Sequence, residues 1–377
     1  MSAGVYIHIP FCRSRCSYCD FATGLYQKEL PEKYVAAVVK EVEQWQGVAQ
    51  PLEVDTIYFG GGTPSLLYPE QVDKILGAVK RRFVVASLAE VTMEMNPGSI
   101  SKETLSGFRN LGINRASFGA QTFDDRELAR LGRSHTTAET LQTFRDLRLA
   151  GFENVSFDLI AGLPGQTLKA WGRNVEISLQ LRPDHLSFYL LEVHEGTPLA
   201  EHIRKGSQPQ PDEDLAAAMY EMMLEMSVAA GYVHYEISNL CLPGLESCHN
   251  SKYWSGLPYY GFGCSAHSFD GCQKRWANER DVKAYVEKME SGESPIVQTW
   301  SLNEQDRRAE SVFLGLRLMK GINLREYQEE FAVDVRTEYR EDFERLLAAG
   351  LIEVRGDLLR LTRAGALLSN EVFAAFV

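Results

Sequence analysis

The chain has 377 residues, 45% of them apolar, and its 51 acidic and 39 basic side chains give a formal net charge of −12. This length allows one large and one small domain around a sizeable core. The acidic balance argues against a protein that coats nucleic acid, because such binding needs a surplus of Lys and Arg. Seven cysteines are an odd number, which suits a reducing cytosol better than a disulfide framework.

The sequence shows no basic segment followed by an apolar one at its start, and no apolar run of about 18 residues. We therefore expect neither a signal peptide nor a spanning helix. A cytoplasmic protein is predicted, and a peripheral contact with a membrane stays open.

Short apolar strands alternate with amphipathic segments along residues 1–235. Such alternation predicts a parallel sheet with outer helices, and helices on one side would curl it into a partial (β/α)6 TIM-type barrel. In barrels of this kind the carboxyl ends of the strands carry the chemistry. The six predicted strands are Val5–Ile9, Val54–Phe59, Glu90–Met95, Ala116–Gly119, Val155–Ala161 and His185–Leu191.

The pattern changes after residue 235. Residues 236–300 are rich in aromatics and are predicted to be an irregular linker. Residues 301–377 predict a helical, winged-helix-like domain, with helices followed by a hairpin around Arg355-Gly356-Asp357. This region has 14 acidic and 11 basic side chains, a net charge of −3, which favours a packing cap over a DNA-binding role.

Cys12, Cys16 and Cys19 form a C-x3-C-x2-C pattern with no fourth cysteine nearby. Three thiolates on one loop can hold three corners of a [4Fe–4S] cube and leave one iron open to a small molecule. Structural zinc is the alternative, with His8 as the fourth ligand of a Cys3His site. His8 lies within a predicted strand, and the cysteine loop lies at the end of that strand. This placement favours an iron–sulfur cluster over structural zinc.

The run Tyr6-Ile7-His8-Ile9-Pro10-Phe11-Cys12, followed by this cysteine spacing, resembles the radical S-adenosylmethionine (SAM) superfamily. Over nearly the whole chain it is most similar to the branch that contains oxygen-independent coproporphyrinogen III dehydrogenase and the haem chaperone HemW. The resemblance implies a [4Fe–4S] cluster whose open iron is chelated by the amino and carboxylate groups of SAM. Reduction of the cluster can then split SAM into methionine and a 5′-deoxyadenosyl radical.

The same resemblance implies a set of SAM contacts at the ends of successive strands. Glycines in the run Gly60–Gly62 would let the backbone approach the ligand closely. Carboxylates would accept hydrogen bonds from the amino group or ribose. The residues implied are Tyr6, Tyr18, Gly61, Gly62, Thr63, Glu94, Gln121, Arg133 and Asp158.

Three departures separate the chain from the coproporphyrinogen enzyme. The enzyme's N-terminal extension is missing before the first strand, and Phe21 stands where the enzyme has a further cysteine. The segment Cys248–Trp254 contains H-N-x-x-Y-W, which resembles the haem-binding signature of the HemW group. The segment 261–268 also resembles sequences of that group. His249 is the candidate axial ligand for haem, with Cys248 and His267 as alternatives. The structural alternative is that this segment packs the barrel against the C-terminal cap.

These features predict a haem carrier that keeps the cluster of an enzyme and passes haem to acceptor proteins, plausibly membrane respiratory haem proteins. Whether SAM is turned over is left open, as is a homodimer through the incomplete barrel. One alternative is a radical SAM enzyme of porphyrin metabolism, such as a coproporphyrinogen III dehydrogenase. A zinc-stabilised regulatory or DNA-binding protein is the other.

Overall fold

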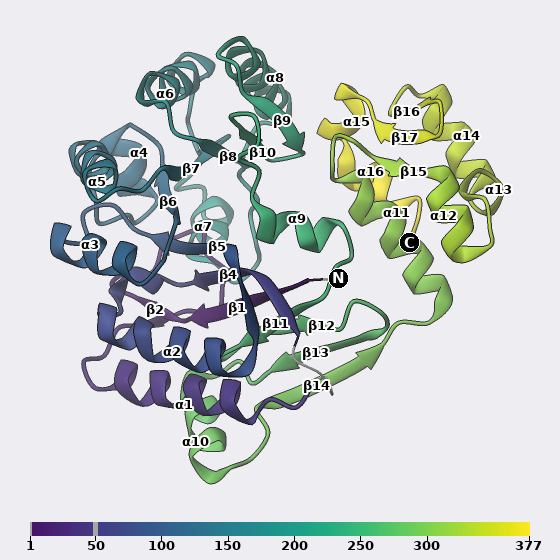
Figure 1. The fold of residues 1–377 in the computed structure, drawn as a ribbon. Coiled ribbons are helices and arrows are strands. Elements are labelled where there is room, and N and C mark those ends of the chain that lie inside the picture. Colours follow the sequence, from purple (N-terminus) through teal and green to yellow (C-terminus); the bar gives the residue numbers. More distant parts are fainter. Residues whose placement is uncertain (1, 48–51) are drawn as a thin grey trace.

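A computed structural model describes residues 2–47 and 52–377 and shows one large sheet with a smaller domain beside it (Figure 1). The strand order in the large sheet is β14-β13-β12-β11-β1-β4-β5-β6-β7-β8-β10-β9. Six consecutive strands of this order, from β1 to β8, are mutually parallel. They are β1 (Ala3–Ile9), β4 (Glu53–Gly61), β5 (Val84–Met95), β6 (Arg115–Gln121), β7 (Asn154–Ala161) and β8 (His185–Leu190). The predicted partial barrel is confirmed.

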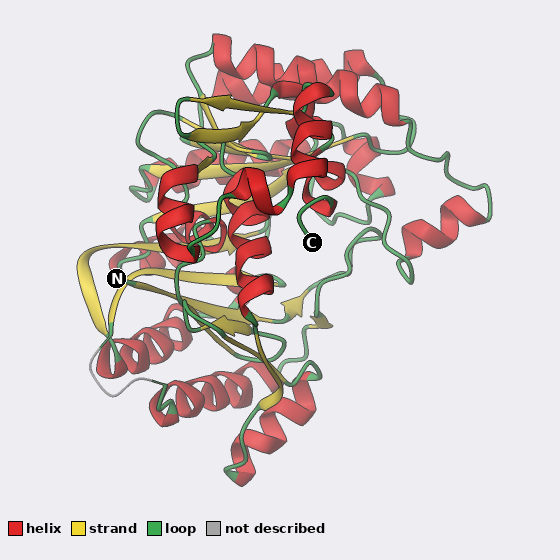
Figure 2. Cartoon of the chain, turned by 90° about the vertical axis from the view of Figure 1, so that its right-hand side faces the viewer, coloured by secondary structure: helices red, strands yellow, loops and turns green. Residues whose placement is uncertain are grey.

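Helices cover the outside of these strands, and the strands run together through the middle of the molecule (Figure 2). Several helices begin at a side chain that caps free backbone N–H groups. Thr136 and Glu139, for example, form a capping box at the start of α5. The outer helices are α1 (Leu30–Gln44), α2 (Pro69–Arg82), α3 (Lys102–Asn110), α4 (Asp125–Arg130), α5 (Thr137–Leu149), α6 (Leu168–Leu181) and α8 (Glu213–Ala229).

Four short elements lie in the loops at the carboxyl end of the barrel. β2 and β3 pair in parallel and bracket the cysteine loop, since Phe11 lies opposite Gly24 and Cys12 opposite Leu25. These elements are β2 (Phe11–Cys12), β3 (Gly24–Leu25), the 3-10 helix η1 (Pro64–Leu66) and α7 (Pro198–Arg204).

The register of the parallel strands brings polar positions level with one another. Glu94 of β5 lies opposite Ser117 of β6, and Asp158 of β7 lies opposite Gly119 on one side and Ser187 on the other. Because parallel strands end at the same edge, these polar side chains collect at one end of the barrel.

Residues 236–300 differ from the predicted irregular linker, because they extend the sheet on both sides. On one side β11 pairs in parallel with β1, and β12, β13 and β14 continue antiparallel. On the other side β10 pairs antiparallel with β8, and β9 forms the edge. These strands are short, so their sequence lacks a long alternating pattern. The elements are β9 (Val233–Glu236), β10 (Asn239–Cys241), α9 (Cys248–Trp254), β11 (Tyr259–Phe262), β12 (His267–Phe269), β13 (Lys274–Asn278), α10 (Val282–Ser291) and β14 (Ile296–Ser301).

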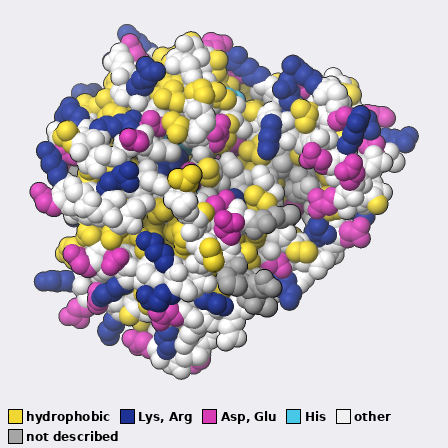
Figure 3. All heavy atoms as spheres, in the orientation of Figure 1, with side chains coloured by type: hydrophobic (Ala, Val, Ile, Leu, Met, Phe, Trp, Pro, Cys, Tyr) yellow, Lys and Arg dark blue, Asp and Glu magenta, His cyan; other side chains and the backbone are white. Residues whose placement is uncertain are grey.

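The C-terminal region forms its own apolar core, around residues such as Val312, Leu346 and Leu359. Its three-stranded sheet has the order β15-β17-β16, and the predicted helices and hairpin are present. Lys and Arg are interspersed with Asp and Glu over this domain on the face drawn in Figure 3. Its elements are α11 (Glu304–Leu316), β15 (Ile322–Asn323), α12 (Leu324–Phe331), α13 (Val335–Glu338), α14 (Arg340–Ala348), β16 (Ile352–Arg355), β17 (Leu358–Leu361), α15 (Arg363–Leu367) and α16 (Ser369–Ala374).

Candidate functional site

The three cysteines of the C-x3-C-x2-C loop line one wall of a cavity at the carboxyl end of the barrel. This cavity has a volume of about 490 Å³. The structure brings ten of the predicted cluster and SAM residues to it, and they come from the cysteine loop, from β4 to β7 or just after them, and from the turn after α4. These ten are Cys12, Cys16, Cys19, Tyr18, Gly61, Gly62, Glu94, Gln121, Arg133 and Asp158.

The glycine run at the end of β4 lets the cysteine loop lie directly against that strand. The Gly62 amide donates to the carbonyl of Ile9 over 2.8 Å. A Cβ at residue 62 would lie 2.8 Å from the carbonyl oxygen of Phe11, and at Gly61 it would meet the His8 ring. The backbone φ of Gly61 is +112°, a region that other residues rarely adopt. Glycine is therefore needed here to place the thiols beside the cavity.

Glu94 is held at the floor of the cavity by two donors. The Tyr58 hydroxyl donates to Oε1 over 2.8 Å and the Gly61 amide donates to Oε2 over 3.0 Å. Burial raises the pKa of Glu94 to about 7, although these two hydrogen bonds act in the opposite direction. The carboxyl group is therefore poised to ionise when a cation arrives in the cavity.

Asp158 is the second carboxyl group of the cavity. Ser117 donates to its Oδ1 over 3.3 Å. Burial raises the pKa of Asp158, while hydrogen bonds from Ser187 and Ser117 and the charge of Arg115 lower it. Glu94 and Asp158 are thus both shielded from water. Electrostatic attraction between a carboxylate and a positively charged ligand group is stronger in such a setting than in water.

Arg133 connects the cysteine loop to the strand ends. Its guanidinium donates to Cys16 Sγ over 3.4 Å, to Asn96 Oδ1 over 2.7 Å and to the Gly119 carbonyl over 2.8 Å. Next to it, Gln121 ends β6 at a bulge with a φ of 63°. A non-glycine residue in this left-handed region is uncommon, and such strain concentrates at ligand sites.

Two of the predicted SAM residues do not line the cavity. Tyr6 lies inside β1 below it, stacked on Tyr58 with 6.1 Å between ring centroids. Thr63 lies behind the cysteine loop, where it donates to Cys12 Sγ over 3.8 Å and accepts from Asn96 over 2.7 Å. These two residues support the site from beneath and behind.

Sequence reasoning missed three residues of the site. Asn96 joins Thr63 to Arg133, and its signal was the Asn96-Pro97-Gly98 turn that ends the third predicted strand. Tyr58 holds Glu94, and Tyr189 lines the cavity from β8. Tyr58 and Tyr189 lie within apolar strands, so their sequence context gave no sign of a polar role.

The donor set fits an iron–sulfur cluster better than zinc. His8 is 6% exposed, and its ring nitrogens are 3.1 Å from the Tyr6 hydroxyl and 3.0 Å from the Ala22 carbonyl. Both nitrogens are thus engaged, and a fourth zinc ligand is not available from His8. Burial raises the pKa of Cys12 and Cys19, so these thiols are protonated without metal, and metal binding would release the protons.

His249, the candidate haem ligand, lies at the opposite end of the barrel, on the buried face of α9. It is 1% exposed, with Nδ1 2.9 Å from Thr56 Oγ1 and Nε2 2.9 Å from the Tyr253 hydroxyl. Burial lowers the pKa of His249 to about 3. Both ring nitrogens have a hydroxyl partner, because H-N-x-x-Y-W places its histidine and tyrosine on the inner face of a short helix. The assignment of His249 as the haem ligand stays a prediction.

The two other candidate ligands of this region are closer to solvent. Cys248 is exposed at the start of α9. Partial desolvation of its sulfur, followed by the negative charges of Glu90 and Asp55, raises the pKa of the thiol to about 11. His267 is exposed on β12, with its ring 6.1 Å from that of Trp300. Cys248 and His267 come from different elements, and neither lines the cavity of the cysteine loop.

Residues 6–176 match the Radical SAM superfamily, and residues 302–368 match the HemN C-terminal domain. The heme chaperone HemW of Bacillus subtilis is 36% identical over 99% of this chain and 98% of its own length. The heme chaperone HemW of Lactococcus lactis is 34% identical over 99% of this chain and 96% of its own length. The chain belongs to the HemW family of radical SAM proteins.

The fold of this family member is also that of a solved enzyme. Coproporphyrinogen III oxidase (HemN) from Escherichia coli, a radical SAM enzyme, matches with a TM-score of 0.87 over 100% of this chain and 90% of that protein. The two sequences are 21% identical, so this likeness concerns the fold alone. Among the described residues, no helix combines the length and apolar character needed to cross a bilayer.

Proposed function

We propose that this protein is a haem chaperone, which binds haem and delivers it to acceptor haem proteins. The observation that carries the proposal is the family membership over nearly the full length of both chains. A second support is Phe21, which is 63% exposed at the cavity. The resemblance implies a further cysteine at this position in the coproporphyrinogen enzyme.

In this proposal Cys12, Cys16 and Cys19 hold a [4Fe–4S] cluster, which supplies an open iron for the amino and carboxylate groups of SAM. The chain's own residues orient SAM in the cavity. Glu94 and Asp158 accept hydrogen bonds from its amino group and ribose, and the backbone at Gly62 admits its methionine part closely. Tyr6, Tyr18, Thr63, Gln121 and Arg133 hold these groups in place.

The acceptors in this proposal are respiratory haem proteins, which would bring a cytoplasmic carrier to the membrane surface. We expect no nucleic acid partner, because the chain has a net charge of −12. A homodimer is compatible with the open sheet edges at β14 and β9.

The test is a transfer experiment with anaerobically purified full-length protein. Its iron and sulfide content is measured, haemin is added, and the loaded protein is mixed with an apo-haem protein such as apomyoglobin. We expect a cluster, a Soret band on loading, and movement of that band to the acceptor. A protein that takes up no haem, or that contains zinc without sulfide, would overturn the proposal.

A radical SAM enzyme is the second candidate function, because both acids expected to contact SAM line a cavity next to the cysteines. Incubation with SAM, a reductant and coproporphyrinogen III separates the two. Decarboxylated product together with 5′-deoxyadenosine would establish the enzyme and exclude a carrier without turnover.

A further inference from the structure

Asn96 joins two side chains that donate to different cysteines of the loop. Thr63 Oγ1 donates to Cys12 Sγ over 3.8 Å. Arg133 Nη1 donates to Cys16 Sγ over 3.4 Å. The Asn96 amide contacts both donors, because its Nδ2 donates to Thr63 Oγ1 over 2.7 Å and its Oδ1 accepts from Arg133 Nη2 over 2.7 Å. One side chain therefore connects the donors to two of the three predicted cluster ligands.

The chemistry of these groups fixes the direction of each hydrogen bond. A guanidinium has donors and no acceptor, so the amide atom of Asn96 that faces Arg133 is the oxygen. The amide nitrogen then faces Thr63 and donates to its hydroxyl oxygen. A hydroxyl that receives this hydrogen bond keeps its own proton for another partner, which here is Cys12 Sγ. Asn96 thus sets the direction in which Thr63 donates.

The turn after β5 holds Asn96 in place. The Asn96 carbonyl accepts from the Ser99 amide over 3.3 Å and from the Ser99 hydroxyl over 2.6 Å. Pro97 follows directly and disfavours a helical backbone at Asn96. Its partner Thr63 is only 2% exposed. Because the turn is fixed and the partner is buried, the network is held by the protein's own contacts.

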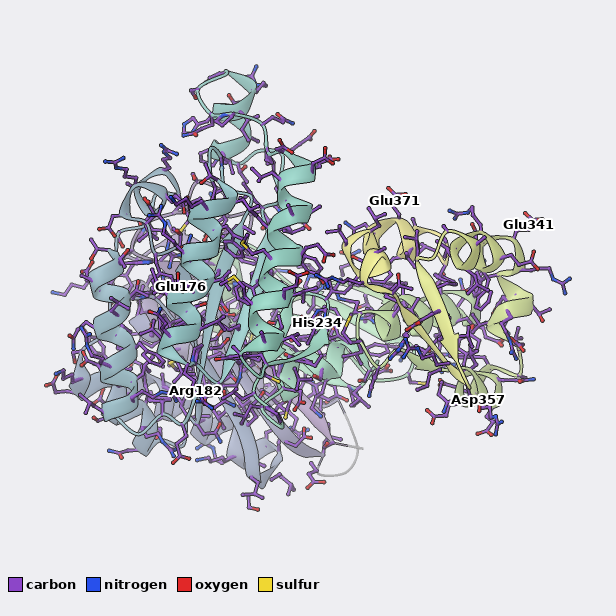
Figure 4. The ribbon with its side chains drawn as sticks, turned by 90° about the horizontal axis from the view of Figure 1, so that it is seen from above. Glu176, Arg182, His234, Glu341, Asp357 and Glu371 are labelled. Carbon is purple, nitrogen blue, oxygen red and sulfur yellow. The ribbon has the colours of Figure 1, made fainter. Side chains whose placement is uncertain are left out.

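Little water can compete with these donors from behind the cysteine loop. The pocket there, which Cys16, Thr63, Asn96 and Arg133 help to line, has a volume of about 20 Å³. That is room for about one water molecule. Among the described residues, none of the C-terminal domain lines this pocket or the larger cavity. Figure 4 shows that domain, which carries Glu341, to one side of the barrel.

Hydrogen bonds to the sulfurs are one of the factors that set the reduction potential of an iron–sulfur cluster. One-electron reduction makes the cluster more negative, and a hydrogen bond to a more negative acceptor is stronger. Donors to Cys12 and Cys16 therefore stabilise the reduced form more than the oxidised form, which raises the potential. A cluster with a higher potential is a weaker electron donor to bound SAM, which suits a carrier that does not turn SAM over.

We propose that Asn96 is a positioning residue that raises the reduction potential of the cluster, by directing Thr63 toward Cys12 and Arg133 toward Cys16. The two amide hydrogen bonds of Asn96 end on Thr63 and Arg133, so it acts through them. This inference rests on the proposed function, because it requires the cluster. It adds a control on how readily that cluster passes an electron to SAM.

The experiment measures the midpoint potential of the cluster in anaerobically purified full-length protein, by electron paramagnetic resonance during titration with dithionite. Thr63→Val removes the hydroxyl with little change of shape and should lower the potential, whereas Thr63→Ser should match wild type. Thr23→Val is the matched control and should leave the potential unchanged. The Thr23 hydroxyl lies just after the cysteine loop and is buried, and among the described residues it has no hydrogen-bond partner.

Asn96→Asp tests the positioning role directly. A carboxylate accepts hydrogen bonds and has none to donate, so Thr63 would turn its proton from Cys12 to the new carboxylate. We expect the potential to fall by about 59 mV or more, which for one electron is a tenfold change in the ratio of reduced to oxidised cluster. Thr63→Val should have no further effect in the Asn96→Asp background, because the hydroxyl no longer faces Cys12.

The outcomes separate this inference from the proposed function. Wild type without iron and sulfide would overturn the cluster of the proposed function itself. A wild-type cluster whose potential is the same in Thr63→Val and Asn96→Asp would overturn the redox role and leave the function standing. An equal fall on Thr63→Val in both backgrounds would show that Asn96 does not direct Thr63. Loss of the cluster from Asn96→Asp would give Asn96 a role in holding the cluster and overturn its role in setting the potential.

Discussion

At the carboxyl end of the barrel strands, which is open, Glu94 and Asp158 face a cavity of about 490 Å³. At the amino end, which α9 closes, His249 and Lys252 of that helix pack against β4. Lys252 is 5% exposed and pairs with Asp55 over 2.7 Å, and His249 bonds to two hydroxyl groups. Both ends carry polar side chains of the kinds found in active sites. His249 and Lys252 have protein partners and line no cavity of the cysteine loop, whereas Glu94 and Asp158 have protein partners and also line that cavity. Residue type alone therefore does not mark a ligand site, and access of the polar side chain to a cavity does.

The largest effect is expected from the cysteine loop. Cys16→Ser should abolish the cluster, with loss of nearly all iron and sulfide, because two thiolates hold a cube poorly. The fold should persist, since Cys16 is only partly buried on a loop. Metal analysis and circular dichroism of anaerobically purified protein measure both. Cys272→Ser, at an exposed cysteine, is the control and should keep the full cluster.

A smaller effect is expected from Gly62→Ala, which would push a methyl group to within 2.8 Å of the Phe11 carbonyl oxygen. Because backbone cannot move aside easily, we expect a loss of stability of ~1–3 kcal/mol and a lower cluster content. Gly24→Ala is the matched control in the same region, where a methyl group meets nothing within 4 Å. Equal cluster content and melting temperature in the two variants would show that the close approach at Gly62 has no role.

A substitution at the closed end should lower the stability of the protein without changing its affinity for SAM. Tyr253→Phe removes the hydroxyl 2.9 Å from His249 Nε2 and leaves that buried nitrogen without a partner. The expected cost is ~1–2 kcal/mol of unfolding free energy, measured by denaturant titration. SAM affinity, measured by calorimetry on cluster-loaded protein, should stay within twofold of wild type. A large loss of SAM affinity with unchanged stability would mean that this end belongs to the functional site.

The six parallel strands and the cysteine loop could be predicted from sequence because both depend on local pattern. Glu94 and Asp158 lie in apolar runs that predict strands, and parallel pairing brings them to one cavity. The position of His249 could not be predicted in this way. It depends on where α9 packs, and α9 is a helix of seven residues in a region predicted to be irregular.

Tyr58 shows a related limit. It lies in an apolar strand, and a tyrosine there is typical of ordinary core packing. Its role appears only when the register places its hydroxyl 2.8 Å from Glu94. This hydrogen bond joins two neighbouring strands, β4 and β5, so it depends on how the strands pair and not on the sequence around Tyr58.

The smallest effect expected is a pH dependence of stability, which reports whether Glu94 at the open end is protonated or ionised. The folded pKa of Glu94 is about 7, above its ordinary value of 4.5, so the folded protein binds more protons than the unfolded chain between these values. Stability without SAM should therefore fall as pH rises from about 5 to 7, by on the order of 1 kcal/mol. Glu41, also raised to about 7 by burial, contributes with the same sign. Glu94→Gln should remove the contribution of Glu94 to this fall in stability and leave the contribution of Glu41.

The affinity for SAM should rise with pH, whereas the stability of the protein without SAM should fall. The amino group of SAM is best matched by an ionised Glu94, so affinity should rise as pH passes upward through about 7 in wild type. In Glu94→Gln the affinity should be lower, and flat across this interval, because no charge forms at that position. Calorimetry at pH 6 and pH 8 on cluster-loaded protein measures the difference. A wild-type affinity that does not change with pH, or an equal slope in Glu94→Gln, would remove Glu94 as the group that accepts hydrogen bonds from the SAM amino group.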